Sequence, residues 1–150
     1  MNREDSAKFA RKLMTDTLKG KTLESIDIPA EGVWSFSFGD SGMTITSPWR
    51  IRAKGAIAIS GYDHGQKFGL PAPVDAMKEA LKLVSTSKVS AINIDSETAD
   101  LRIEFANGYS VELFHESSGH EGWNIASKKG VMIVAMGGGQ LAIWDNLPAR

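Results

Sequence analysis

The order of local patterns along the chain repeats once, and this repeat is the strongest constraint on the fold. Each copy begins with an amphipathic stretch and continues with short segments in which apolar and polar residues alternate. Alternation with a period of two indicates a strand with one buried face, whereas apolar residues three to four apart indicate a helix. We therefore predict an α+β fold made of two related helix-plus-four-strand units, at about residues 3–60 and 73–136.

Both predicted helices have recognisable ends. Residues 3–19 carry an apolar stripe at helical spacing, and Gly20 follows directly, as glycine often does after the last turn of a helix. Residues 74–84 carry a second stripe, and Pro73 stands where the first turn of a helix tolerates proline. We expect one helix at the start of each unit.

The strand-like segments of the two units match in order. They are TLESIDI, VWSFSF, MTIT, WRI and GAIAIS in the first unit, and VSAINI, LRIEF, YSVELF, WNI and VMIVAM in the second. The matched positions include Trp49 with Trp123, Ile51 with Ile125 and Gly55 with Gly130. Each unit is expected to form an antiparallel four-strand meander bounded by turn residues.

Turn lengths predict which residues face one another across the hairpins. A three-residue loop at 106–108, with Gly108 in the left-handed conformation, keeps the apolar residues of both strands on one face. A four-residue loop at 39–42 does the same in the first unit. The expected pairs are Phe105 with Tyr109, Ile103 with Val111, Leu101 with Leu113 and Arg102 with Glu112, and also Phe38 with Met43 and Phe36 with Ile45.

Each meander then has one apolar face and one solvated face. Two such meanders packed together with two helices can bury the apolar faces in a common core. The final stretch GGGQLAIW, at 137–144, predicts a tight turn and a C-terminal strand. A chain of 150 residues fits one domain, and we expect that domain to cover residues 1–150.

The composition excludes several classes of protein. The chain has no cysteine, so neither a disulfide scaffold nor a thiolate metal site is possible. Its start, MNREDSAKFARKLM, is charged and unlike a secretory signal. No apolar run approaches the roughly 20 residues that a membrane-spanning helix needs. We expect a cytoplasmic protein that makes no contact with a membrane.

Charge is unevenly distributed. Residues 1–88 contain 13 Lys and Arg against 10 Asp and Glu, whereas residues 89–150 contain 4 against 8. Between Val89 and Trp123 there are seven acids and one base, Arg102. Nucleic-acid binding needs clustered Lys and Arg, so a nucleic-acid partner is not expected. The acidic segment is interpreted first as a solvated sheet face, and second as a surface that attracts a basic partner.

No complete catalytic or metal-binding motif is present. The two histidines of HESSGH, His115 and His120, are five residues apart in a loop, whereas the zinc-protease motif places them four apart on a helix. The glycines 137–139 precede a strand rather than a helix, so they do not form a phosphate-binding loop. We predict no catalytic residue, no metal and no cofactor.

The run DHGQKFGLPAPVD, at 63–75, joins the two units. Asp63 and His64 are adjacent, and adjacent side chains on an extended chain point to opposite sides, which argues against a catalytic pair. Lys67 is a candidate for binding an anion or a partner. The simplest interpretation is a connecting loop whose Phe68 and Leu70 insert into the core.

Four stretches together suggest a family. PWRI, DHGQKFGLPAPVD, SSGHEGWNI and GGGQLAIW resemble signatures of an uncharacterised family of small bacterial proteins, over residues from about 22 to 144. Members of this kind resemble immunity proteins, which neutralise the toxins of contact-dependent or other polymorphic toxin systems by covering their active sites. The predicted pair of units, with two sheets and two helices, is also similar to the Whirly-type arrangement, which some such immunity proteins adopt. The near-neutral pI of 6.3 departs from the acidity expected of inhibitors of basic nucleases.

These observations lead to one principal hypothesis and two alternatives. The principal hypothesis is a non-enzymatic immunity protein that binds a basic protein toxin through Glu97, Asp100 and Glu104, with a contribution from Asp63, His64 and Lys67. The first alternative is a ligand-binding protein or enzyme that uses the loop from Asp63 to Lys67. The second is a single-stranded nucleic-acid binder.

Overall fold

The computed structural model describes residues 1–148; residues 149 and 150, which the predicted domain also covers, lie outside the described part. Within it there are two α-helices, eleven strands and two short 3-10 helices. The α-helices are α1 (Arg3–Leu18) and α2 (Ala76–Val84), and the 3-10 helices are η1 (Gly61–Asp63) and η2 (Gly137–Gly139). The strands are β1 (Ser25–Ala30), β2 (Val33–Ser37), β3 (Ser41–Ile45), β4 (Trp49–Ala53), β5 (Ala56–Ser60), β6 (Val89–Ile94), β7 (Leu101–Phe105), β8 (Ser110–Leu113), β9 (Trp123–Ser127), β10 (Met132–Ala135) and β11 (Leu141–Trp144).

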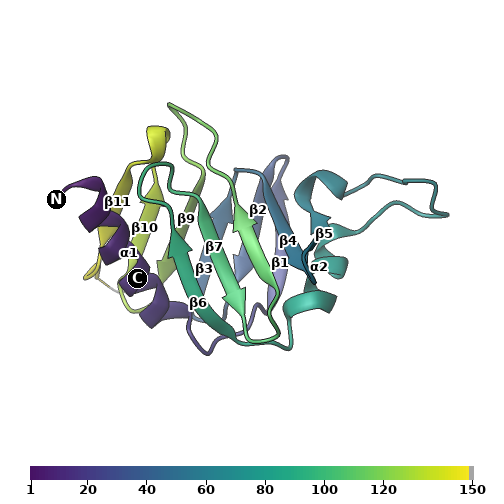
Figure 1. Cartoon of the computed structure of the whole chain (residues 1–150), viewed down its shortest axis with the longest axis horizontal. Coiled ribbons are helices and arrows are strands. Elements are labelled where there is room, and N and C mark those ends of the chain that lie inside the picture. Colours follow the sequence, from purple (N-terminus) through teal and green to yellow (C-terminus); the bar gives the residue numbers. More distant parts are fainter. Residues whose placement is uncertain (149–150) are drawn as a thin grey trace.

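The strands form two antiparallel sheets. One has six strands in the order β1-β2-β3-β9-β10-β11, and the other has five in the order β5-β4-β8-β7-β6. One cluster of buried apolar side chains draws on both sheets and both helices. The predicted α+β class, with two antiparallel sheets, two helices and a C-terminal strand, is confirmed (Figure 1).

The two halves exchange strands between the sheets, which the predicted four-strand meanders did not include. In each half of the chain, three strands form a meander, and the next two form a hairpin that joins the other sheet. The hairpin β4–β5 pairs with β8, and the hairpin β9–β10 pairs with β3. Alternation specifies which face of a strand is buried but not which distant strand is its partner, and for this reason the exchange was not predicted.

The exchange places matched residues in corresponding positions. Trp49, at the start of β4, faces Leu113 of β8, and Trp123, at the start of β9, faces Ile45 of β3. All four side chains are at most 2% exposed. Each half therefore places a tryptophan beside a buried aliphatic residue of the other half.

The two α-helices close opposite ends of the sandwich. Helix α1 contacts β6 and β11, and α2 contacts β1 and β5, so each helix lies against an edge of both sheets (Figure 1). Helix α1 begins after Asn2, whose side chain accepts a hydrogen bond from the Asp5 N–H. Helix α2 begins two residues later than predicted, because Asp75 caps it by accepting from the Lys78 N–H.

One predicted hairpin register is confirmed and the other is wrong. The loop 106–108 is confirmed: Leu101 faces Leu113, Arg102 faces Glu112, and the Phe105 N–H donates to the Tyr109 carbonyl. The loop 39–42 is replaced by a two-residue turn, so Phe36 faces Met43 rather than Ile45. A shift of two residues keeps the same side chains on the buried face, so alternation does not distinguish the two registers.

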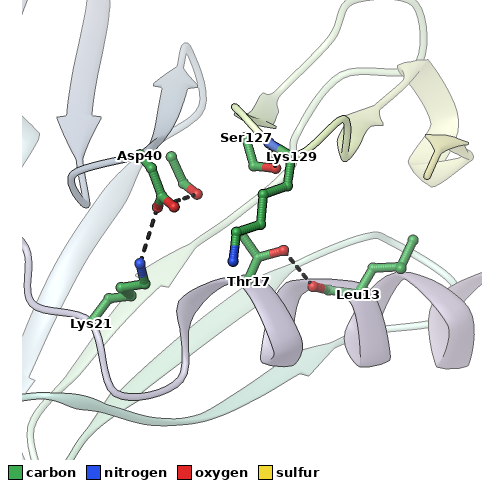
Figure 2. A network of polar contacts seen from close by, with 7 residues as sticks. Leu13, Thr17, Lys21, Asp40, Ser127 and Lys129 are labelled. Carbon is green, nitrogen blue, oxygen red and sulfur yellow. Dashed lines mark hydrogen bonds and ion pairs between the residues drawn. The ribbon is translucent and has the colours of Figure 1, made fainter. Parts of the chain in front are cut away.

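Asp40 lies in this two-residue turn and connects three parts of the chain. Its Oδ1 accepts from Lys21 Nζ at 3.2 Å (Figure 2). Its carbonyl accepts from the Lys128 N–H. The hydrogen bond from Lys21 lowers the pKa of the Asp40 carboxyl, and the charge of Lys129 acts in the same direction. The contacts join the linker after α1 to the β2–β3 and β9–β10 turns.

Two of the three glycines of η2, Gly137 and Gly139, are required by close packing. A Cβ at Gly137 would lie 2.7 Å from the Gly119 Cα, and a Cβ at Gly139 would lie 2.9 Å from the Thr98 Cα. Gly138 and Gly139 also have positive φ values of 77° and 86°. The triple glycine therefore lets η2 pack between two neighbouring loops.

The described residues contain no helix that is both long and apolar enough to span a membrane.

This packing predicts that Gly139→Ala destabilises the protein more than Gly55→Ala does. Both positions have positive φ, but a Cβ at Gly55 would meet no atom within 4 Å. We expect Gly55→Ala to lower the free energy of unfolding by about 1 kcal/mol, the cost of the left-handed backbone, and Gly139→Ala by about 3 kcal/mol. Chemical denaturation of both variants measures the difference, and equal losses would contradict the packing argument.

Candidate functional site

The segment from His64 to Asp75 projects from the body of the protein between η1 and α2, and we call it the projecting loop (Figure 1). Its base is held by two backbone hydrogen bonds, from the Gly65 N–H to the Val74 carbonyl and from the Val74 N–H to the Gln66 carbonyl. A tight turn follows, in which the Leu70 N–H donates to the Lys67 carbonyl. The loop is therefore an ordered excursion with its own hydrogen bonds.

Phe68 and Leu70 do not insert into the core, contrary to the sequence interpretation. Phe68 is 64% exposed and Leu70 is 54% exposed. Phe68 and Gly69 both have positive φ, at 46° and 77°, which produces a tight turn outside the body of the protein. A non-glycine residue with positive φ is uncommon, and such backbone strain is concentrated at functional sites.

His64 has a structural place at the base of the projecting loop. Its Nδ1 accepts a hydrogen bond from the Ala76 N–H at 3.1 Å, so it satisfies an amide in the first turn of α2. Its ring also packs edge-on against Trp34, with the ring centroids 5.6 Å apart. His64 therefore fixes the loop to the helix.

Asp63 and Lys67 do not form a site with His64. The Asp63 carboxylate accepts from the Ser60 N–H at 3.0 Å, while Lys67 is exposed in the loop. The described residues place no ion-pair partner within 4.0 Å of Asp63. The predicted separation of the adjacent Asp63 and His64 side chains agrees with their different partners.

A cavity of about 580 Å³ opens beside η1, and we call it the aromatic pocket. Its size is within the range of small-ligand sites. Four aromatic residues line it, Trp34, Trp49, Tyr62 and Phe114, and two carboxylates, Asp63 and Glu116, also belong to its lining. The other lining residues are Gly32, Thr46, Ser47, Pro48, Arg50, Ile57, Ser60 and Gly61.

Two buried polar atoms in the lining of this pocket have no hydrogen-bond partner among the described residues. They are Ser47 Oγ and Trp49 Nε1. Buried polar atoms in native structures are nearly always hydrogen-bonded, so an exception calls for an explanation. Trp49 Nε1 lies under Gly61, where a Cβ would approach it to 2.7 Å.

In the second half of the chain, the indole N–H of the corresponding tryptophan, Trp123, has a hydrogen-bond partner. Trp123 Nε1 donates to the Ala99 carbonyl at 2.9 Å, and Ala99 has a positive φ of 62°. The residue at the matching place in the first half is Gly32, which also has a positive φ, 75°, but lines the aromatic pocket. The pocket therefore lies in the first half at the position where, in the second half, the hydrogen bond from Trp123 to Ala99 fills the corresponding space.

The positive charge of Arg50 in the pocket is partly neutralised by Glu112. Its Nε donates to Glu112 Oε1 at 2.9 Å, and Arg52 Nε lies 3.0 Å from the same oxygen. The guanidinium of Arg50 also stacks over the ring of Phe114, with Cζ 4.7 Å from the centroid. Glu112 is shared by the two guanidiniums, so it neutralises only part of the charge of Arg50, and it holds the stack in place.

The predicted acidic residues occupy a different part of the molecule. Glu97 and Asp100 lie in the turn between β6 and β7, at the end of the sandwich opposite the projecting loop (Figure 1). Asp100 Oδ1 accepts from the His115 N–H at 2.9 Å, and Glu104 pairs with Arg102 at 3.3 Å. Glu97 is exposed. The six predicted residues therefore do not form one continuous surface.

The turn that carries Glu97 is stabilised by Asp95. Hydrogen bonds from the backbone N–H groups of Thr98 and Glu97 to this carboxylate, both 2.9 Å long, lower its pKa. Arg3 Nη1 donates to the Glu97 carbonyl at 2.8 Å and connects the turn to α1. The acidic turn is thus well ordered.

The described residues contain no group of three or more His, Asp or Glu side chains arranged to hold a metal ion. His115 is turned toward the Met136 carbonyl, and His120 is exposed in the same loop. The two histidines of HESSGH therefore have different environments and share no ligand position.

Comparison with known proteins places the chain in a family. Residues 14–145 match the description "Family of unknown function (DUF6188)", a span that covers most of the chain. The chain belongs to the DUF6188 family. No curated protein and no solved structure matches it. In this DUF6188 member, both the projecting loop and the aromatic pocket fall within the matched residues.

The aromatic pocket of this DUF6188 member was not predicted from the sequence. Its walls come from the β1–β2 turn, the β3–β4 connection, β5, η1 and the segment after β8, which are far apart along the chain. The only local signals were the adjacent Pro48 and Trp49 and the residues Tyr62 and Asp63 directly after β5. Neither signal specifies a cavity until the strand exchange is known.

The structural place of His64 predicts that His64→Ala lowers stability. The variant leaves the Ala76 amide without its acceptor and removes the contact with Trp34, and we expect a loss of about 1–2 kcal/mol in the free energy of unfolding. Lys67→Ala, in the same loop, is the matched control and is expected to change it by less than about 0.5 kcal/mol. Urea denaturation of both variants tests this, and an unchanged midpoint for His64→Ala would exclude the proposed role.

Proposed function

We propose that this protein is a non-enzymatic binding module that docks a protein partner on the projecting loop and the adjoining end of the five-stranded sheet. The observation that carries the proposal is the concentration of exposed apolar side chains in three consecutive parts of the chain, β5, η1 and the projecting loop. Ile57, Tyr62, Phe68 and Leu70 are 59%, 82%, 64% and 54% exposed, and they account for half of the eight large apolar side chains exposed in the described residues. Grouped exposed apolar residues mark interaction surfaces.

The shape of the loop suits this role. Its base is fixed by hydrogen bonds and by His64, so presenting Phe68 and Leu70 costs little conformational entropy on binding. Two prolines, Pro71 and Pro73, further restrict the backbone conformation of the segment that leads back to α2. Aromatic and aliphatic anchors of this kind carry most of the free energy of a protein interface.

We further propose that the partner is a toxin and that the protein is its cytoplasmic immunity protein. The resemblance of PWRI, DHGQKFGLPAPVD, SSGHEGWNI and GGGQLAIW to signatures of small bacterial proteins of this kind supports the proposal. Two of these stretches, PWRI and DHGQKFGLPAPVD, supply residues of the projecting loop and the aromatic pocket. The projecting loop is suited to entering a concave active site and covering it.

The acidic residues Glu97 and Glu104 have a secondary role in this proposal. They lie in the β6–β7 turn and in β7, which β4 and β8 separate from β5 and the projecting loop, and would raise the rate of encounter with a basic partner rather than contribute to the contact itself. Asp100 is less suited to binding, because its carboxylate already accepts the His115 amide. The main contact is therefore assigned to the projecting loop.

The test uses the adjoining gene, which we expect to encode a secreted protein with a toxic C-terminal domain. We expect the chain to bind that domain and to restore growth when both are co-expressed. The double variant Phe68→Ser/Leu70→Ser should weaken binding by about tenfold or more, because it removes two anchors, and should lose protection.

The control is the double variant Met136→Ser/Leu147→Ser, whose residues are also exposed, at 39% and 37%, but lie outside the projecting loop. It should bind and protect as the wild type does. Failure of the wild-type chain to bind and protect would overturn the immunity proposal, and full protection by Phe68→Ser/Leu70→Ser would overturn the assignment of the surface.

A further inference from the structure

The aromatic pocket lies directly beside the exposed apolar side chains of the proposed docking surface. Ile57 and Tyr62 belong to both, since they line the pocket and are among the exposed apolar residues. A partner seated on the projecting loop would therefore cover the mouth of the pocket. The inference that follows rests on the proposed function and concerns the chemical group that enters the pocket.

The lining of the pocket favours a cation over an anion. Its ionisable side chains are Arg50, Asp63 and Glu116, which carry one positive and two negative charges. Glu112 lies 2.9 Å from Arg50 and 3.0 Å from Arg52, so it neutralises only one of these two positive charges, whereas no ion-pair partner lies within 4.0 Å of either pocket carboxylate in residues 1–148. The five charges together leave the pocket and its surroundings with one excess negative charge. An acidic group in the pocket would face these two carboxylates at a cost, and a basic group would gain from them.

The walls favour a planar cation. Trp34, Tyr62 and Phe114 present aromatic surfaces, and the face of an aromatic ring attracts a cation held against it. The pocket already contains such a contact, between Arg50 and Phe114. A guanidinium stacks on aromatic rings and donates to carboxylates in a fixed planar geometry, whereas an ammonium is more strongly hydrated.

The unpaired Ser47 hydroxyl supplies a further acceptor. Ser47 is 6% exposed, its Oγ has no partner among the described residues, and it belongs to the same lining. A hydroxyl oxygen accepts one N–H of a guanidinium. Because this Oγ is closed to solvent, it accepts from an occupant of the pocket only if the lining shifts as the side chain enters. The corresponding region of the second half has no such opening, because Trp123 donates there to the Ala99 carbonyl.

We propose that the aromatic pocket receives an arginine side chain of the partner protein, stacked between its aromatic walls and paired with Asp63 and Glu116. The side chain enters as the partner docks on the projecting loop. Arg50, held by Glu112, keeps Phe114 in place and is a positioning residue for this site.

The experiment measures the binding of a small probe to the full chain, without any partner. N-acetyl-arginine amide is titrated into the protein while the indole Nε1–H signals of the four tryptophans are followed by NMR. We expect weak saturable binding, in the millimolar range, that shifts the signals of Trp34 and Trp49 but not that of Trp123, which serves as an internal control. N-acetyl-glutamine amide and N-acetyl-glutamate amide should leave all four signals in place.

Two double variants test the role of the carboxylates. Asp63→Asn/Glu116→Gln should weaken binding of the arginine probe about fivefold or more, because it removes both charges, while the amide oxygen that replaces the Asp63 carboxylate still accepts from the Ser60 N–H. Glu4→Gln/Asp5→Asn makes the same change in net charge in the first turn of α1 and should bind as the wild type does.

Ser47→Ala should weaken binding by a smaller factor, and Ser110→Ala, at a buried serine outside the pocket, should not.

The proposal is overturned if the arginine probe leaves the Trp34 and Trp49 signals in place, if the neutral or acidic probe shifts them equally, or if Asp63→Asn/Glu116→Gln binds as the wild type does. These outcomes are separate from the fate of the proposed function. Growth protection that depends on Phe68 and Leu70 can hold while the probe fails to bind, in which case only the pocket assignment falls.

Discussion

The pairings of β3 with β9 and of β4 with β8 join the two halves of the chain, and the remaining architecture depends on them. In each pair, one strand ends a three-strand meander and the other begins the hairpin of the opposite half. Met43 faces Ile125 across one seam and Ile51 faces Val111 across the other, and all four are at most 1% exposed. The centre of each sheet is therefore a contact between halves, so neither sheet is complete without both.

The two halves differ where the proposed function lies. After β10 the second half adds η2 and β11, whereas after β5 the first half continues into η1 and the projecting loop. The tryptophan that begins the exchanged hairpin donates to Ala99 in one half, whereas in the other half its buried Nε1 lies under Gly61 without a hydrogen-bond partner among the described residues. A nearly symmetric frame thus supports an asymmetric surface, with a rigid projection and an adjoining aromatic cavity on the same side.

The sequence predicted those features that depend on local patterns. Both helices, the strands and the loop 106–108 were predicted correctly, because amphipathic spacing and the Asn107-Gly108 step act over a few residues. The pairing of β3 with β9 was missed, because a period of two specifies a face and not a partner. The exposure of Phe68 was missed as well, since apolar character alone predicts burial, whereas the hydrogen bonds at the base of the projecting loop and its left-handed turn hold the ring outside.

Complementation between fragments tests the exchange of strands most directly. The chain is divided within the projecting loop, between Ala72 and Pro73, and residues 1–72 and 73–150 are produced separately. We expect that neither fragment shows a cooperative unfolding transition alone, because each lacks the partner strands at the centre of its sheet. Mixed in equal amounts, they should form a one-to-one complex with such a transition. A fragment that folds alone to a stable monomer would contradict the claim that the two halves complete each other's sheets.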